Sequence, residues 1–256
     1  MNLEVHLGIY DQPRYYEIAF SFRDLPKEVD FLEKAIARYS KIKVRNVLEL
    51  ASGPSPYLEE WHRRGYRYFG LDKSNEMLEY ARRKAARRHI PVRLLQGDMN
   101  EFALSGLRVD LAYVLLGSLF VSSTAEFLRH LDCVARVVKS GGLYILDHVV
   151  WFRMFENRPE NWTISANGIK VRCAVRWKPV EEAAQTVLEQ ISLDVSKNKT
   201  KKRFRENYLR KIFFPQEFLH LVECNGKFAF CGWFNDFDVN KPVSSEGRQV
   251  VVLRRT

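Results

Sequence analysis

Short apolar runs with strand character alternate with amphipathic stretches over the first 150 residues of the chain. Between the runs, apolar side chains recur every three or four residues, which is the period of a helix with one buried face. Strands that alternate with helices in this way are typical of a parallel sheet covered on both faces. The expected strands span residues 46–50, 68–71, 92–96, 109–115 and 143–146.

Capping residues indicate where the helices between these strands begin and end. Ser74 is a good N-cap residue, and Glu76 then lies in the positively polarised first turn. Basic residues over 82–88 suit the other end of the same helix, so a solvated helix end explains them. Further helices are expected over residues 24–40 and 124–139, the second stopping at Gly141–Gly142.

The hydrophobic period changes to two near residue 150. Val171, Cys173, Val175 and Trp177 alternate with mostly basic residues, which is typical of a half-buried antiparallel strand. Asn167–Gly168, just before them, is a signal for a type I′ hairpin turn. A helix over 215–222 and strands over 228–234 and 249–253 follow. We therefore predict an α/β fold: a doubly wound, mostly parallel seven-stranded Rossmann-like sheet with an inserted small antiparallel β-sheet.

Composition and charge narrow the class of protein. Hydrophobic residues make up 46% and charged residues 28% of the 256 residues, which excludes a disordered, collagen-like or disulfide-stapled chain. The formal net charge of +10 invites a nucleic-acid or anionic-surface partner. The four cysteines have neither CxxC spacing nor a neighbouring His cluster, so no zinc site is indicated and a cytoplasmic location fits best. The longest apolar stretch, 111–121, is too short to span a bilayer, so we expect a soluble protein with no membrane partner.

Acidic residues stand at the ends of the predicted parallel strands. The segment 47–57, VLELASGPSPY, carries Glu49 near a strand end and then a turn of small residues that lets a ligand approach the main chain. Asp72 ends the second strand, where a carboxylate can accept two hydrogen bonds from ribose hydroxyls. The third strand leads into Asp98 and Met99, an acceptor and an apolar contact beside the expected place of an adenine ring. Together they predict a ribose-bearing ligand.

Five segments, taken in order over residues 44–147, resemble the motifs of class I S-adenosylmethionine-dependent methyltransferases: VLELASGP, GLDKSNEMLEYAR, QGDMNEF, VDLAYVLLGSL and LDCVARVVKSGGLYILD. The N-terminal segment YYEIAFSFRD resembles the cofactor cap of a small-molecule subset of this family, with Tyr16 and Arg23 as the residues carried over. Either side chain can equally be ordinary packing or solvated charge. The resemblance implies methyl transfer, S-adenosylmethionine as cofactor, S-adenosylhomocysteine as product, and no metal.

The same resemblance implies roles at the methionine end and the ribose of the cofactor. Glu49 would orient the methionine end, and the backbone of Ala51, Ser52 and Gly53 would line it. Asp72 would hold the ribose. Strand-end carboxylates can also cap helices or make surface ion pairs, but the ordered motif series favours the functional interpretation.

Further positions match the family at the adenine and the sulfonium. Lys73 and Met77 would flank the adenine, and Asp98 and Met99 would meet its amino edge. Leu115 would lie near the sulfonium. We predict a methyltransferase core with its N-terminal cap at residues 1–150 and 214–256, and the antiparallel insert at 151–213 over the active site.

The glycine loop departs from the family pattern, which usually has three glycines. Only Gly53 survives, with Ala51 and Ser55 in the outer places. Neither Ala nor Ser takes a positive φ without a cost, so the turn must be milder or slightly strained. The loop also argues against a nicotinamide cofactor, whose fingerprint needs a second glycine for the pyrophosphate.

His148 and Trp151 are the candidates on the substrate side, because they follow the last core strand where ligands bind in open α/β folds. Each also has a structural interpretation, as a buried histidine and as core of the insert. No catalytic side chain is predicted, since in-line transfer needs mainly positioning and exclusion of water. The fourth strand ends in LLGS rather than in the Asn/Asp-Pro-Pro-aromatic turn of exocyclic base methylation. A small-molecule acceptor is favoured.

Two alternatives stay open. Residues 197–205 carry six cations in an expected hairpin tip, which would suit an RNA methyltransferase, although a solvated turn is the commoner explanation. A nucleic-acid partner is therefore conceivable but not favoured. The second alternative is a catalytically silent S-adenosylmethionine-binding protein, which the altered glycine loop and the lack of a predicted base would suit.

Overall fold

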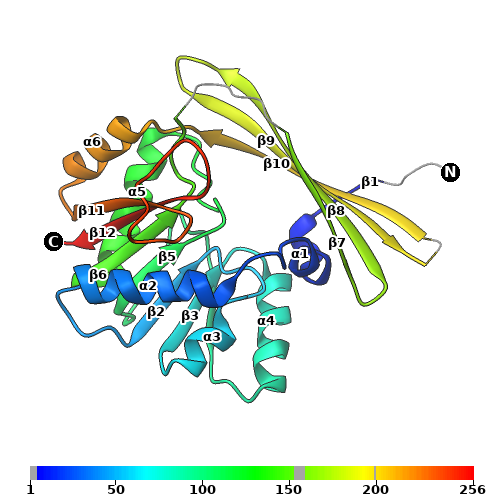
Figure 1. Ribbon diagram of the computed structural model, residues 1–256, viewed down its shortest axis with the longest axis horizontal. Helices are drawn as coiled ribbons and strands as arrows, with labels where there is room; N and C mark the ends of the chain where they lie inside the picture. Colours follow the sequence, from blue (N-terminus) through cyan, green and yellow to red (C-terminus); the bar gives the residue numbers. More distant parts are fainter. Residues whose placement is uncertain (1–4, 153–158, 199) are drawn as a thin grey trace.

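The molecule contains two β-sheets, and helices cover both faces of the one with seven strands (Figure 1). The computed structural model describes residues 5–152, 159–198 and 200–256. Within these ranges, no helix combines the length and the apolar character that crossing a membrane requires. The helices are the 3-10 helix η1 (Ile9–Asp11) and α1 (Pro13–Ala19), α2 (Leu25–Tyr39), α3 (Leu58–Arg63), α4 (Asn75–Arg87), α5 (Thr124–Val137) and α6 (Pro215–Asn225).

The main sheet has seven strands: β2 (Asn46–Leu50), β3 (Arg67–Asp72), β4 (Arg93–Gln96), β5 (Val109–Val114), β6 (Val138–Asp147), β11 (Phe228–Asn235) and β12 (Gln249–Arg255). Their order is β11-β12-β6-β5-β2-β3-β4. The strands from β6 to β4 pair in parallel, and β12 and β11 add an antiparallel edge. The predicted doubly wound, mostly parallel seven-stranded sheet is confirmed.

Helices on the two faces of this sheet form two separate apolar clusters. On one face, Leu32 of α2, Trp61 of α3 and Leu78 of α4 are buried in one cluster. On the other, Phe127 of α5 and Phe218 of α6 are buried in the second. The expected N-cap of α4 is confirmed, because the Ser74 side chain accepts a hydrogen bond from the Met77 N–H at 3.1 Å. The cap orients the first turn of α4 toward the carboxyl edge of the sheet.

The second sheet contains β1 (Val5–Leu7), β7 (Glu160–Ala166), β8 (Ile169–Glu181), β9 (Thr186–Lys197) and β10 (Thr200–Lys211), in the order β1-β10-β9-β8-β7. The strands β7 to β10 are antiparallel, and the predicted turn at Asn167 and Gly168 joins two of them with positive φ angles of 51° and 71°. Their apolar face packs on α1 through Val171, Cys173 and Leu193. The strand β1 joins this sheet from the N-terminal side, parallel to β10. The insert at 151–213 stays a prediction about domains, and its residues 153–158 lie outside the described residues.

One helix end differs from the expectation. The helix α5 ends at Val137, and β6 begins at once with Val138, so Gly141 and Gly142 lie in a strand instead of stopping the helix. A Cβ atom on Gly142 would lie 2.5 Å from the Asp110 carbonyl oxygen. The glycine is therefore required by close contact between β6 and β5, and not by a turn. A sequence pattern cannot distinguish these two uses of glycine.

A buried ion network joins the main sheet to α2. Asp147, at the end of β6, is fully buried and pairs with the Arg248 guanidinium. Arg248 Nη1 also contacts Glu28 Oε1 at 2.5 Å, and Glu28 accepts a hydrogen bond from the Tyr57 hydroxyl. The other Asp147 oxygen accepts the Gly117 N–H at 2.8 Å. Two carboxylates in the interior thus share one guanidinium.

We expect Arg248→Ala to destabilise the protein by about 3–5 kcal/mol, because it leaves Asp147 and Glu28 buried without their cation. Urea unfolding at neutral pH measures the change. Arg83→Ala, which removes an exposed arginine of α4 with no ion pair in the described structure, should change stability by less than about 0.5 kcal/mol. A loss below about 1 kcal/mol for Arg248→Ala would contradict the role of the network.

Candidate functional site

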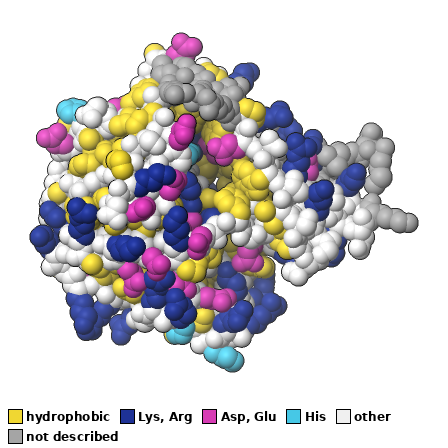
Figure 2. Space-filling model, viewed as in Figure 1, with side chains coloured by type: hydrophobic (Ala, Val, Ile, Leu, Met, Phe, Trp, Pro, Cys, Tyr) yellow, Lys and Arg dark blue, Asp and Glu magenta, His cyan; other side chains and the backbone are white. Residues whose placement is uncertain are grey.

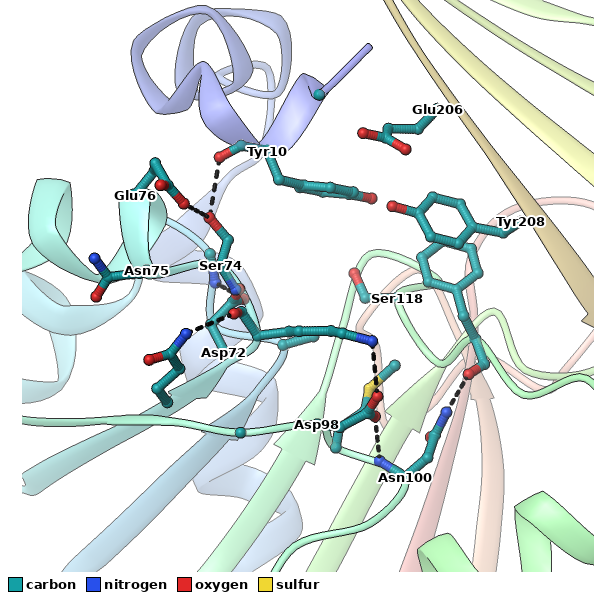
Figure 3. A pocket seen from close by; sticks show the side chains of 18 of the residues that line it. Tyr10, Asp72, Ser74, Asn75, Glu76, Asp98, Asn100, Ser118, Glu206 and Tyr208 are labelled. Carbon is teal, nitrogen blue, oxygen red and sulfur yellow. Dashed lines mark hydrogen bonds and ion pairs between the residues drawn. The ribbon is translucent and has the colours of Figure 1, made fainter.

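A cavity of about 700 Å³ opens at the carboxyl edge of the main sheet, between that edge and the second sheet (Figure 3). Its wall comes from the loops after β2, β3, β4 and β5, from η1 and α1, and from β10. Seven of the predicted site residues line it: Tyr16, Ala51, Gly53, Asp72, Lys73, Asp98 and Met99. The fold thus brings together predicted residues from four separate segments of the chain.

The loop after β2 keeps the tight form of a glycine loop although two of its glycines are replaced. Ala51, Gly53 and Ser55 all have a φ of 50°, in the left-handed region. For Ala and Ser this conformation costs roughly 1 kcal/mol or more each, so the strained form of the predicted turn is the one observed. The Ser52 N–H donates to the Leu71 carbonyl at 2.9 Å, which holds the loop against β3. The shape of the turn therefore depends on its contact with β3 and not on the conformational preferences of Ala51 and Ser55.

Asp72 is fixed by backbone donors on both sides. Its Oδ2 accepts the Gly53 N–H at 2.6 Å, and its Oδ1 accepts the Ser74 N–H at 2.8 Å. Burial raises the pKa of Asp72, and these backbone hydrogen bonds oppose the rise. Each oxygen keeps a further lone pair, and the carboxylate has no ion pair in the part of the chain that the structure describes. Asp72 is placed to accept two hydrogen bonds from a vicinal diol.

Asp98 lies on the next loop along the edge. Its Oδ1 accepts the Asn100 N–H at 2.9 Å, and its Oδ2 pairs with Lys73 Nζ at 3.2 Å. Met99 also lines the cavity. Met77, in contrast, is fully buried in α4 and does not line it. The part of the cavity predicted to bind the adenine thus offers one carboxylate, one lysine and one thioether.

Glu49 lies behind the wall and not in it. The side chain is only 4% exposed, and Tyr68 and Tyr113 donate their hydroxyls to its Oε2. Burial raises the pKa of Glu49 to about 8, against the opposing effects of the Tyr68 hydrogen bond and of the Arg23 charge. Two other predicted residues, Ser52 and Leu115, are also buried and outside the lining. The carboxyl group that is predicted to orient the methionine end is therefore buried and has a raised pKa.

Of the two residues of the predicted cap, Tyr16 and Arg23, only Tyr16 lines the cavity. Tyr16 lines the cavity, with its ring centroid 4.5 Å from that of Phe20. Arg23 is outside the lining, donates from Nε to the Phe20 carbonyl at 3.1 Å, and places its guanidinium 5.5 Å from the centre of the Tyr57 ring. Burial raises the pKa of both Tyr16 and Glu49, and the Arg23 charge opposes both rises.

His148 and Trp151, the predicted substrate residues, do not line the cavity. His148 has a left-handed φ of 52°, and its N–H donates to the Gln249 carbonyl at 2.7 Å. Trp151 meets the Trp177 ring edge-on at 5.8 Å between centroids, and its N–H donates to the Phe213 carbonyl at 2.8 Å. His148 thus contacts β12 of the main sheet, and Trp151 packs on β8 of the second sheet.

The side of the cavity near β10 contains four residues that the sequence analysis did not single out as site residues: Tyr10, Phe120, Glu206 and Tyr208. Phe120 and Tyr208 stack with centroids 4.6 Å apart and planes 18° apart, and Tyr10 lies 6.1 Å from Tyr208. Glu206 and Tyr208 share one face of β10, since alternate residues of a strand point the same way. That alternation was a usable signal for Glu206, but nothing in the sequence pairs Tyr10 with Tyr208.

The cavity is acidic although the chain is basic. Six carboxyl side chains and one lysine are among its described lining residues: Asp11, Asp72, Glu76, Asp98, Glu126, Glu206 and Lys73. No group of three or more His, Cys, Asp or Glu side chains in the described chain could hold a metal ion. A wall of this charge favours cationic or neutral ligands over polyanions.

Comparisons with known proteins agree with this architecture. A family model described as a methyltransferase domain matches residues 47–142. None of the curated proteins compared with the chain is similar to it in sequence.

Among solved structures, an S-adenosylmethionine-dependent methyltransferase from Clostridium acetobutylicum has a TM-score of 0.78 and 18% identity, covering 94% of this chain and 96% of its own. The amino pentose methyltransferase CalS10 from Micromonospora echinaspora has a TM-score of 0.72 and 18% identity, covering all of both chains. The sugar N-methyltransferase KedS8 from Streptoalloteichus has a TM-score of 0.73 and 19% identity, covering 100% of this chain and 96% of its own. Residues 47–142 therefore match a methyltransferase domain, and the chain as a whole has the fold of S-adenosylmethionine-dependent methyltransferases.

Proposed function

We propose that this chain transfers a methyl group from S-adenosylmethionine to a small-molecule acceptor bound between the main sheet and the second sheet. The observation that carries the proposal is the single cavity that joins Asp72 and Asp98 to the aromatic wall of β10. The shared fold with sugar and amino pentose methyltransferases supports a small acceptor. The methyltransferase core supplies one part of the wall and the second sheet the other.

The residues present fit an adenosine-bearing cofactor. Asp72 has free lone pairs beside two fixed hydrogen bonds, which suits ribose hydroxyls, and Asp98 and Met99 lie where an adenine edge would meet them. Bound there, S-adenosylmethionine would supply an electrophilic methyl group on a sulfonium sulfur. The chain has to orient the acceptor and exclude water, and α1 and β10 cover the cavity from the side opposite the sheet edge.

An RNA acceptor is less well supported. Arg203 and Arg205 of β10 alternate with Phe204 and Tyr208 and therefore point away from the cavity. Arg203 is already paired with both oxygens of Asp194, at 2.5 and 2.7 Å. On the face shown in Figure 2, Lys and Arg side chains are spread over the part around the main sheet and over the second sheet, and they are not gathered in one patch. Residue 199 of the predicted basic loop lies outside the described residues.

We expect Asp72→Ala to weaken binding of S-adenosylhomocysteine by about 10- to 100-fold, because it removes two charge-assisted hydrogen bonds to the ribose. Isothermal titration calorimetry measures the dissociation constant. Glu79→Gln is the control, since Glu79 lies on α4 outside the cavity lining and pairs with Arg82. Unchanged binding in Asp72→Ala would remove the proposed ribose contact, and no binding by the wild type would remove the proposed function.

The raised pKa of Glu49 predicts a pH-dependent stability. Its folded pKa of about 8 lies above the ordinary value of 4.5, so the stability linked to its neutral form is full below pH 4.5 and is lost as the pH rises through 8. Glu49→Gln should therefore unfold at a higher temperature than the wild type at pH 9 when no ligand is bound. At pH 4.5 the two proteins should differ much less. Thermal unfolding followed by circular dichroism at both pH values measures this difference.

The same variant separates stability from binding. If Glu49 meets the cationic methionine end, binding favours its ionised form, so wild-type affinity for S-adenosylhomocysteine should rise between pH 6 and pH 8 relative to Glu49→Gln. The ligand's own amine titrates equally in both experiments, so the comparison with Glu49→Gln removes its effect on affinity. Parallel pH profiles for the two proteins would exclude this contact. Glu101→Gln, on an exposed residue, serves as the control for an added amide.

A further inference from the structure

The acceptor side of the cavity combines aromatic rings with one carboxylate. In Figure 3, Glu206 and the hydroxyl ends of Tyr10 and Tyr208 converge on the same part of the cavity. The rings of Tyr10, Tyr208 and Phe120 form a continuous series, with centroid distances of 6.1 and 4.6 Å. The Glu206 charge also raises the pKa of the Tyr208 hydroxyl, after the larger effect of burial, which places the two groups close together. This part of the wall is apolar in body and negative at its polar end.

No cation compensates Glu206 in the described structure. Lys73, the lysine of the lining, is paired with Asp98 at the adenine end. Arg210 is the next cation along the same face of β10, and its guanidinium lies 5.5 Å from the Phe120 ring centre. It is already bound to Glu189 at 2.8 Å and to the His148 carbonyl at 3.0 Å, and it does not line the cavity. Glu206 is therefore the unpaired charge of the acceptor side.

A protonated amine matches this arrangement better than the other common methyl acceptors. Its charge would pair with Glu206 through a charge-assisted hydrogen bond, and its cationic head would lie against electron-rich tyrosine faces. A carboxylate or phosphate would meet an uncompensated negative charge. A hydroxyl acceptor gains nothing from that charge, and none of the described lining residues is a histidine that could deprotonate it.

We propose that the acceptor is a small primary or secondary amine, and that Glu206, Tyr208 and Tyr10 recognise its nitrogen. The inference rests on the proposed methyltransferase function and names the substrate class of the same site. The ammonium loses a proton to solvent before reaction, and Glu206 then accepts a hydrogen bond from a remaining N–H. The nitrogen lone pair forms the new C–N bond while the S–C bond breaks with its electron pair left on sulfur. The methylated nitrogen is then cationic and stays paired with Glu206 until release.

The test compares an amine with its matched alcohol on the full chain saturated with S-adenosylhomocysteine. Butan-1-amine and butan-1-ol differ only in the polar head, and ligand-detected NMR titration measures their dissociation constants at pH 7. We expect the amine to bind at least about 10-fold more tightly, as one charge-assisted contact implies. Glu206→Gln should abolish this preference and leave the affinity for S-adenosylhomocysteine unchanged. Glu182→Gln, on the exposed turn between β8 and β9, should keep the preference.

Product chemistry supplies a second readout. Methyl-labelled S-adenosylmethionine is incubated with the protein and a panel of amino sugars, each matched to its parent sugar, and the products are passed over a cation exchanger at pH 5. Label retained on the exchanger supports an amine acceptor. Equal binding of the matched probes, binding of neither, or label only in neutral products would overturn the inference. Loss of S-adenosylhomocysteine binding in the wild type would instead count against the proposed function.

Discussion

The carboxylate of Asp72 is the constraint on which the cofactor side of the cavity depends. Parallel strands bring their carboxyl ends to one edge of a sheet, but that alone leaves the loops beyond them free. Asp72 accepts the N–H groups of Gly53 at 2.6 Å and of Ser74 at 2.8 Å, so one side chain ties the loop after β2 to the start of α4. The strained φ angles of Ala51 and Ser55 are tolerated within this tie. The wall is therefore arranged before any ligand arrives.

The sequence predicted the features that depend on neighbouring residues better than those that depend on contacts between distant segments. The cap at Ser74 and the turn at Asn167 and Gly168 follow from local chemistry, and both are confirmed. The order of the strand-end acids predicted the crevice, because the parallel topology brings those ends together. The conformation of Ala51 was harder to predict, since it opposes the residue's own preference and depends on contacts with β3. Tyr10 and Tyr208 meet only because η1 and β10 cover the same edge, and no short-range pattern records that.

The distribution of charge also changes what the net charge implies. A formal charge of +10 first pointed to a polyanionic partner, yet the described lining of the cavity holds six acids and one lysine. Strand alternation accounts for part of this separation, because Arg203 and Arg205 of β10 point away from the face that carries Glu206 and Tyr208. Ion pairs such as Arg203 with Asp194 account for more of it. The net charge of the chain is positive, whereas the described side chains that line the cavity have a net negative charge.

The main sheet contains the same hydrogen-bonded arrangement at two places, and its role differs between them. Asp147 ends β6 and accepts the Gly117 N–H of the loop after β5 at 2.8 Å, just as Asp72 ends β3 and accepts the Gly53 N–H of the loop after β2. In both loops the glycine has a positive φ, 62° and 50°. Asp147 is fully buried, is paired with Arg248 and does not line the cavity, so a ligand there does not meet it. Asp72 faces the cavity and has no ion pair in the described chain, so its remaining lone pairs are free. A carboxylate at a strand end is thus structural where a cation pairs with it, as at Asp147, and is available for binding where none does, as at Asp72.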